Sequence, residues 1–190
     1  MFRFYVGALG QENQSEIKKR LPEQTYHLVD LADSSSTNFE IATNGSSAPE
    51  LHFLIGIDSA DQNRGAQKGV LDPLKGMYWT WNSGYLSFKI EGSSPASALP
   101  AHLIAYHIGG YRTPYSTIWK IKLIPDSLVR SSDDRIPQFE IPIELDYFFD
   151  GPLAIHIGQN PDCTTPGELA RKISLNFAST FKGINRTENP

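Results

Sequence analysis

Cysteine is almost absent from this chain of 190 residues, which carries only Cys163. A single thiol excludes an internal disulfide and a metal cluster built on several thiolates. Lysine and arginine total 17 against 21 aspartates and glutamates, and they are scattered, so a nucleic-acid-binding protein is not favoured. No uninterrupted apolar run approaches the roughly 20 residues that a membrane-spanning helix needs. These absences leave an ordinary globular chain, long enough for one domain with a substantial core.

Motifs of common enzyme chemistry are missing too. The sequence has no serine-hydrolase elbow, phosphate-binding loop, HExxH pair or Rossmann fingerprint. Its candidate catalytic carboxylates show no spacing that requires any two to face one another across a cleft; they are Asp58, Asp61, Asp72 and Glu91. We therefore expect that the protein is not an enzyme.

The N-terminus has no signal peptide in this numbering. Met1 leads directly into the strand-like FRFYVGAL, without a basic region followed by an apolar one. Two alternatives follow from these residues alone. Either the protein stays in the cytoplasm, or the numbering begins inside a longer exported precursor.

Strand-like segments dominate the chain. They are rich in aromatic and β-branched residues, and clusters of Gly, Ser, Asn and Pro separate them. Such a pattern predicts a mainly β protein, an antiparallel β-sandwich that forms a single domain over residues 1–184. The predicted strands are Phe2–Ala8, Thr25–Leu31, Leu51–Ile57, Met77–Trp81, Tyr85–Glu91, His102–Ile108, Ser116–Ile124, Gln138–Leu145 and Leu153–Ile157.

One α-helix is predicted near the C-terminus, packed on the sandwich. Thr165 can cap it, Pro166 suits its first position, and Glu168 completes a capping box. Gly183 is a natural stop, and we expect residues 185–190 to be a frayed tail. The apolar stripe of this helix recurs every four residues, at Leu169, Ile173, Phe177 and Phe181.

The segment Gly69–Gly92, GVLDPLKGMYWTWNSGYLSFKIEG, places Trp79 and Trp81 two residues apart. In an extended strand that spacing sends both indoles to one face. A paired indole face indicates either packing between sheets or a binding site. An unmodified indole is a poor metal ligand, because its nitrogen carries a proton and offers no in-plane lone pair. A metal site here would therefore need His, Met or a chemically altered Trp.

The histidines are candidate metal ligands as well as ordinary packed residues. His102 and His107 are five apart, so on one regular strand they face opposite sides. Three of the five histidines share similar strand settings, and two of these on neighbouring strands can converge. Those three settings are LHFLIG around His52, YHIGGY around His107 and AIHIGQ around His156, with His27 the fifth histidine.

The segment Leu71–Gly92 and the following AYHIGGY, with LHFLIGIDS and YHLVD, resemble the MbnP-like copper-binding proteins. This family is named from the methanobactin operons of methane-oxidising bacteria, and the resemblance runs from about Phe2 to Phe181. Its members are exported, mostly β proteins, typically encoded beside a di-haem cytochrome of the MauG/peroxidase type. In characterised relatives that partner oxidises a Trp to kynurenine, whose aromatic amine joins histidines in binding copper.

The resemblance implies an exported copper-binding protein, periplasmic or secreted, that is the substrate of a di-haem MauG-like oxidase. Trp79 and Trp81 are the residues it implies for oxidation. His107 is the best-matched metal ligand, and His52 is the second. Nitrogen donors of this kind suit copper. The sequence differs from some members in two respects. They place His two residues from the oxidised Trp, where this chain has a second Trp, and some carry cysteine pairs, where this chain has Cys163 alone.

Two alternatives come from the residues themselves. Trp79, Trp81 and Tyr85 can form an aromatic platform for a sugar or a peptide, without metal. Alternatively every Trp is buried and purely structural. Exposure discriminates between them, because a platform must face solvent, whereas a metal site places a Trp close to His107.

Overall fold

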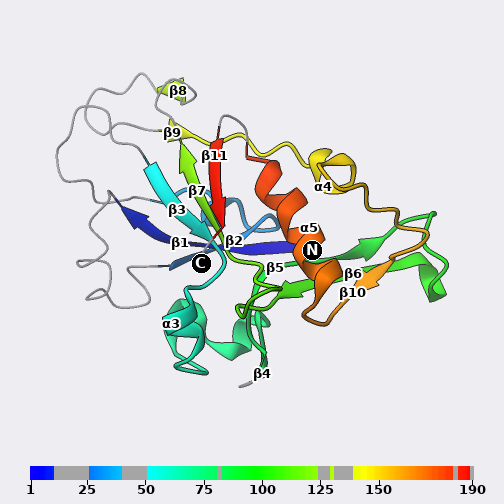
Figure 1. Ribbon diagram of the computed structural model, residues 1–190, viewed down its shortest axis with the longest axis horizontal. Coiled ribbons are helices and arrows are strands. Elements are labelled where there is room, and N and C mark those ends of the chain that lie inside the picture. The colour runs from blue at the N-terminus through cyan, green and yellow to red at the C-terminus, as the bar shows by residue number, and fades with distance from the viewer. Residues whose placement is uncertain are drawn as a thin grey trace.

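The computed structural model of the chain describes residues 1–10, 26–39, 51–80, 83–123, 129–130, 139–181 and 184–188 (Figure 1). Within these residues strands dominate, which confirms the prediction of a mainly β protein. The longer strands are β1 (Phe2–Gly10), β2 (Tyr26–Asp30), β3 (Leu51–Ile55), β5 (Gly84–Ser93), β6 (Leu103–Gly109), β7 (Trp119–Leu123) and β11 (Ile184–Glu188). The short ones are β4 (Tyr78–Thr80), β8 (Val129–Arg130), β9 (Phe139–Glu140) and β10 (Asp162–Cys163), and the α-helices are α3 (Ser59–Gln62), α4 (Tyr147–Asp150) and α5 (Glu168–Ser179).

A single curled sheet takes the place of the predicted antiparallel β-sandwich. Among the described strands nine belong to it, in the order β10-β6-β5-β1-β3-β7-β11, with β2 beside β1 and β4 beside β5. The sheet is mixed, because β10 runs parallel to β6. β8 and β9 form a separate two-stranded pair. A sandwich is therefore not confirmed, and the reason lies in how β1 is paired.

β1 has two different partners along one edge. Its first residues pair with β5 through Phe4 and Phe88, and its later ones pair with β3 through Val6 and Ile55. β2 overlaps both stretches and so occupies the opposite edge. The sheet divides where the partner changes, near Tyr5, and Figure 1 shows β5 and β6 leaving β1 in a different direction from β3 and β7. A sheet that curls in this way encloses core on its own faces and needs no second sheet.

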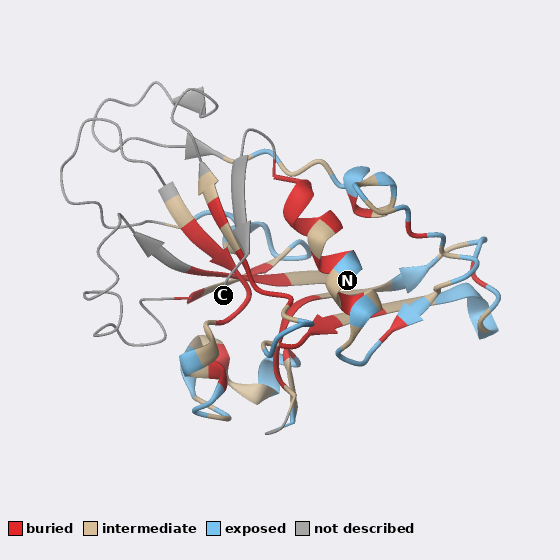
Figure 2. Cartoon of the chain, viewed as in Figure 1, coloured by how far each residue is buried: buried red, intermediate tan, exposed pale blue. Residues whose placement is uncertain are grey.

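Helix α5 covers one face of the sheet and forms the larger core with it (Figure 2). The Phe177 ring lies 5.3 Å from that of Phe4 and 4.6 Å from that of Phe88, measured between ring centroids. Asn176 is fully buried in the same helix, where it donates hydrogen bonds to the carbonyls of Phe148 and Leu153. The helix therefore joins the sheet to the α4 region.

The predicted capping box does not form. Helix α5 begins at Glu168 after Gly167, and no side chain caps it. The reason is that Asp162 and Cys163 pair with β6 as β10, so the chain is still extended just before Thr165. The apolar stripe is confirmed at Ile173 and Phe177, which are buried, whereas Phe181 is buried beyond the end of the helix.

Two further predictions about the C-terminal third are wrong. Residues Leu153–Ile157 are not a strand, because their backbone is held at Leu153 by the Asn176 side chain. Part of the tail expected to fray over residues 185–190 is a strand, since β11 pairs antiparallel with β7. Residues 189–190 lie outside the described part of the chain.

The helices of the described residues include none with both the length and the apolar character needed to cross a bilayer. The longest, α5, has 12 residues and a buried face that packs on the sheet.

Replacing Phe177 should destabilise the protein strongly. Phe177→Ala leaves a cavity among four aromatic rings and should lower the free energy of unfolding by about 3–5 kcal/mol. Chemical denaturation measures this change. Leu74→Ala is the matched control, because Leu74 is 95% exposed and its loss should change stability by less than about 0.5 kcal/mol. Equal effects of the two substitutions would contradict the packing described above.

Candidate metal site on the sheet face opposite the helix

The segment between β3 and β5 folds over the sheet face that points away from α5. Alternation along β1 separates the two faces, since Phe4 and Val6 enter the helix-side core and Tyr5 enters the other. The segment contains α3, two 3₁₀ turns and β4, and Figure 1 shows α3 and β4 together at this side of the sheet. The second core that it closes consists of Tyr5, Tyr26, Ile57, Leu71, Met77, Tyr85 and Leu86, with Trp79 packed against it.

Three buried tyrosines bind this segment to the sheet by their hydroxyls. Tyr5 donates to the carbonyl of Val70 at 3.0 Å, and Tyr85 donates to that of Leu71 at 2.9 Å. Tyr26 donates to the Asp61 carboxylate at 2.7 Å. Burial raises the pKa of all three phenols above the usual value, so each stays protonated and able to donate. The tyrosines thus place the whole segment relative to β1, β2 and β5.

Gln62 adds a fourth attachment, at the turn that joins β4 to β5. Its side chain is 1% exposed and pairs with the Tyr85 backbone, accepting from N at 2.7 Å and donating to O at 3.4 Å. A side chain at Gly84 would collide with the Gln62 amide, and Gly84 also has φ of 72°. Glycine is required there for both reasons. The Gln62 hydrogen bonds therefore help to fix the position of β4, the strand that carries Trp79.

Trp79 lies with its six-membered ring over β6. A Cβ placed on Gly109 would approach Trp79 Cζ3 to 3.1 Å, which is tighter than ordinary contact. Trp79 is half-buried, between the second core and the open part of the sheet face. Gly109 therefore provides the space that the indole occupies.

His107 lies on the same face of β6 as Gly109, two residues away. Tyr106 and Ile108 of β6 enter the helix-side core, so alternation places His107 and Gly109 together on the other face, about 7 Å apart along the strand. The His107 side chain is 23% exposed, and its Nε2 lies 2.7 Å from Oε1 of Glu91. The same oxygen accepts from Lys89 Nζ at 3.0 Å. Trp79, which lies over Gly109, and His107 are thus on one face of the sheet.

Glu91 is an ionised acceptor at neutral pH. Slight burial raises the pKa of its carboxyl, but the hydrogen bonds from Lys89 and His107 outweigh burial and lower that pKa below its usual value. The carboxylate therefore supplies a negative charge beside the imidazole.

His52 is not brought together with His107. It lies on β3 opposite Gly10, near the far end of β1. His107 lies opposite Lys89, which in turn lies opposite Arg3 near the start of β1. The seven residues from Arg3 to Gly10 span on the order of 20 Å of strand. One metal ion cannot bind both imidazoles in this arrangement.

The other predicted candidates lie elsewhere. Trp81 falls outside the described residues. His27 Nε2 bonds to the carbonyl of Ser36 at 2.7 Å, and His102 Nδ1 bonds to that of Ser97 at 3.0 Å. Across the described part of the chain no group of three or more His, Cys, Asp and Glu side chains is arranged to hold a metal. Unmodified, these residues therefore offer one imidazole with a neighbouring carboxylate.

Sequence reasoning did not assign Lys89 or Gly109 to this face, and it named Glu91 only as a candidate catalytic carboxylate. The alternation of Lys89 and Glu91 in β5 shows that they share a face, but not that His107 lies opposite them. That information is the register between β5 and β6, which includes an irregularity between Leu86 and Phe88.

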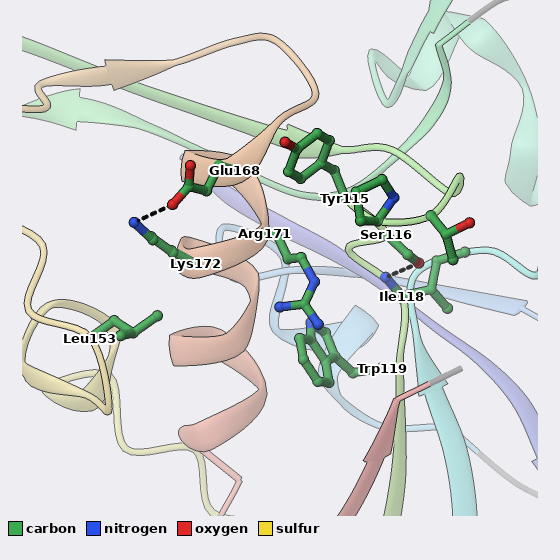
Figure 3. A pocket seen from close by; sticks show the side chains of 10 residues that line it. Tyr115, Ser116, Ile118, Trp119, Leu153, Glu168, Arg171 and Lys172 are labelled. Atoms are coloured by element: carbon green, nitrogen blue, oxygen red, sulfur yellow. Dashed lines mark hydrogen bonds and ion pairs between the residues drawn. The ribbon is translucent and has the colours of Figure 1, made fainter. Parts of the chain in front are cut away.

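A groove of about 550 Å³ lies on the helix side, between the first turns of α5 and the chain that leads into β7 (Figure 3). Trp119 lies at its base but is only 3% exposed, and its N–H donates to Ser174 Oγ at 2.9 Å. The Arg171 guanidinium lies 5.6 Å from the centre of the indole, over the face on which a ligand would stack. Tyr85, expected in an aromatic platform with Trp79, is fully buried. These described aromatic residues therefore do not form an exposed platform.

Comparison with known protein families matches residues 1–165 to the model of the MbnP family. No curated protein and no solved structure matches the chain. The matched residues include every strand from β1 to β10 and all the residues of the Trp79–His107 face, and they end before α5.

Filling the space at Gly109 should displace Trp79. Gly109→Ala places a methyl group 3.0 Å from the backbone oxygen of Tyr85 and 3.1 Å from Trp79 Cζ3, so β5 and the ring must both adjust, and the indole N–H signal of Trp79 in an NMR spectrum should shift. Gly92→Ala is the control, since its Cβ would lie 3.9 Å from the nearest atom and should leave that signal unchanged. An unmoved Trp79 signal in the Gly109 variant would refute the placement of the indole.

Removing the Gln62 amide should loosen β4. Gln62→Leu leaves the buried N–H and C=O of Tyr85 without these side-chain partners, which should cost about 1–3 kcal/mol of stability. Denaturation measures the loss, and faster hydrogen exchange at the Tyr85 amide locates it. Gln67 is a half-buried glutamine of the same segment, so Gln67→Leu should have a smaller effect on stability. Unchanged protection of the Tyr85 amide would count against the attachment.

Proposed function

Because the chain belongs to the MbnP family, we propose that it is an exported copper-binding protein, periplasmic or secreted. The observation that carries this proposal is the placement of Trp79 over Gly109, on the same face of β6 as His107. A di-haem MauG-type partner oxidises Trp79 to kynurenine, and the modified side chain then takes part in the metal site. The chain is the substrate of that oxidation, not an enzyme.

The donor set fits copper only after the oxidation. An intact indole offers no in-plane lone pair, and Glu91 already occupies one nitrogen of His107. Conversion to kynurenine opens the five-membered ring and leaves an aromatic amine on the six-membered ring. The atom of that ring that lies over Gly109 is Cζ3, which is para to the carbon that keeps the amine. Imidazole and arylamine nitrogens form a donor set that suits copper.

The oxidation balances with peroxide as the oxidant. The C2–C3 bond of the indole breaks and each carbon gains an oxygen atom, while two hydrogen peroxide molecules are reduced to water. Hydrolysis of the resulting formamide releases formate and frees the amine. The half-buried position of Trp79 leaves part of the ring accessible from the surface, whereas the tyrosine attachments hold its strand in place.

Copper binding should depend on both the modification and His107. We expect the protein co-produced with its di-haem partner to carry kynurenine at Trp79 and one equivalent of copper. Intact-mass analysis with peptide mapping detects the first, and metal analysis the second. Trp79→Phe and His107→Ala should each weaken copper binding by more than the 10–100-fold that loss of an outer-shell partner typically costs.

His156→Ala is the control, because His156 is an exposed histidine outside this face. His52→Ala should also keep copper, given its distance along β1 from His107. Peptide mapping separates Trp79 from Trp81 as the modified residue. A chain that binds no stoichiometric copper, both before and after treatment with the partner, would refute the copper-binding function.

A further inference from the structure

We propose that Glu91 is the positioning residue for His107. It holds the imidazole as the tautomer with hydrogen on Nε2, so that Nδ1 is the nitrogen that binds the metal. The inference rests on the proposed function, since it concerns the same site.

The assignment follows from which groups can donate. Oε1 of Glu91 accepts from Lys89 Nζ at 3.0 Å, and an ammonium can only donate. The same oxygen lies 2.7 Å from His107 Nε2, so in this contact the ring nitrogen is the donor and must carry hydrogen. A neutral imidazole with hydrogen on Nε2 has its lone pair on Nδ1. A carboxylate on the far nitrogen is the usual arrangement for a metal-binding histidine, where it fixes the ring and raises its basicity.

The sheet fixes the three side chains relative to one another. Lys89 lies directly opposite His107 in the ladder, and Glu91 lies opposite Ala105, two residues further along each strand. The Lys89 side chain is only 16% exposed, whereas that of Glu91 is 40% exposed. The ammonium of Lys89 is therefore the more buried member of the pair that it forms with Glu91. Cross-strand neighbours at such positions stay within contact distance because the ladder sets their spacing.

The neighbours of His107 on its own face of β6 have short side chains. Nδ1 is bonded to Cγ, the ring carbon that is attached to Cβ. A metal ion on Nδ1 therefore lies nearer the strand backbone than one on Nε2. The residues two before and two after His107 on the same face are Ala105 and Gly109, the smallest possible. Gly109 is also the residue over which the Trp79 ring lies. An ion on Nδ1 would thus lie beside short side chains, with the Trp79 ring as its neighbour over Gly109.

The test reads the imidazole itself. Long-range ¹H–¹⁵N NMR spectra of the metal-free protein should show hydrogen on Nε2 of His107 and a lone pair on Nδ1. Copper(I), which is diamagnetic, should shift Nδ1 in the oxidised protein and leave the Nε2 hydrogen in place. Glu91→Leu should lower copper(I) affinity about 10–100-fold and expose the Nε2 hydrogen to rapid exchange. Glu91→Gln keeps a side-chain oxygen as acceptor and should restore most of both properties.

Glu168→Leu is the matched control, because it removes an equal charge from an exposed ion pair with Lys172 on α5. Hydrogen on Nδ1 in the metal-free protein, or a copper-induced shift at Nε2, would overturn the inference. So would a Glu91→Leu protein that keeps full affinity and exchange protection. If the wild-type protein shows the expected tautomer but no response to copper, the proposed function fails and the assigned metal-binding nitrogen fails with it.

Discussion

The pairing of one edge of β1 with two different strands is the constraint on which the rest of this structure depends. β5 takes the first residues of β1 and β3 takes the last, so the sheet divides and curls around Tyr5. Alternation along β1 then supplies both cores, with Phe4 facing α5 and Tyr5 facing the segment that carries Trp79. Trp79 and His107 therefore belong to the sheet face that points away from α5.

That face is ordered by hydrogen bonds more than by regular structure. The segment over it has short helical turns and a three-residue strand, too little to define its own position. The phenols of Tyr5, Tyr26 and Tyr85 reach it from the sheet, and Gln62 reaches back to the Tyr85 backbone. Each of these polar groups is buried, and an unmade bond at such a position is costly. This is why a largely irregular segment can hold an indole in one place.

The sequence allowed the strand content to be predicted, but not the curled sheet, the uncapped helix or the contact between Glu91 and His107. Strand periodicity shows which side chains share a face, whereas it does not show whether a sheet, a helix or a loop covers that face. Thr165 and Glu168 have the spacing of a capping box, yet pairing of Cys163 with β6 keeps the chain extended there. His52 shares the strand setting of His107, and only the register of β1 shows how far apart they lie.

A single imidazole with one nitrogen already occupied is a weak basis for a metal site, so the proposed copper site depends on Trp79. Gly109 lies tight against two groups, because a Cβ there would meet Tyr85 O of β5 at 3.0 Å and Trp79 Cζ3 at 3.1 Å. The glycine therefore admits both the β5 backbone and the Trp79 ring, on a face of β6 that it shares with His107. The Lys89–Glu91 pair fixes the imidazole while the tyrosine-held segment fixes the indole. The donor that is missing is the one that oxidation of that ring would add.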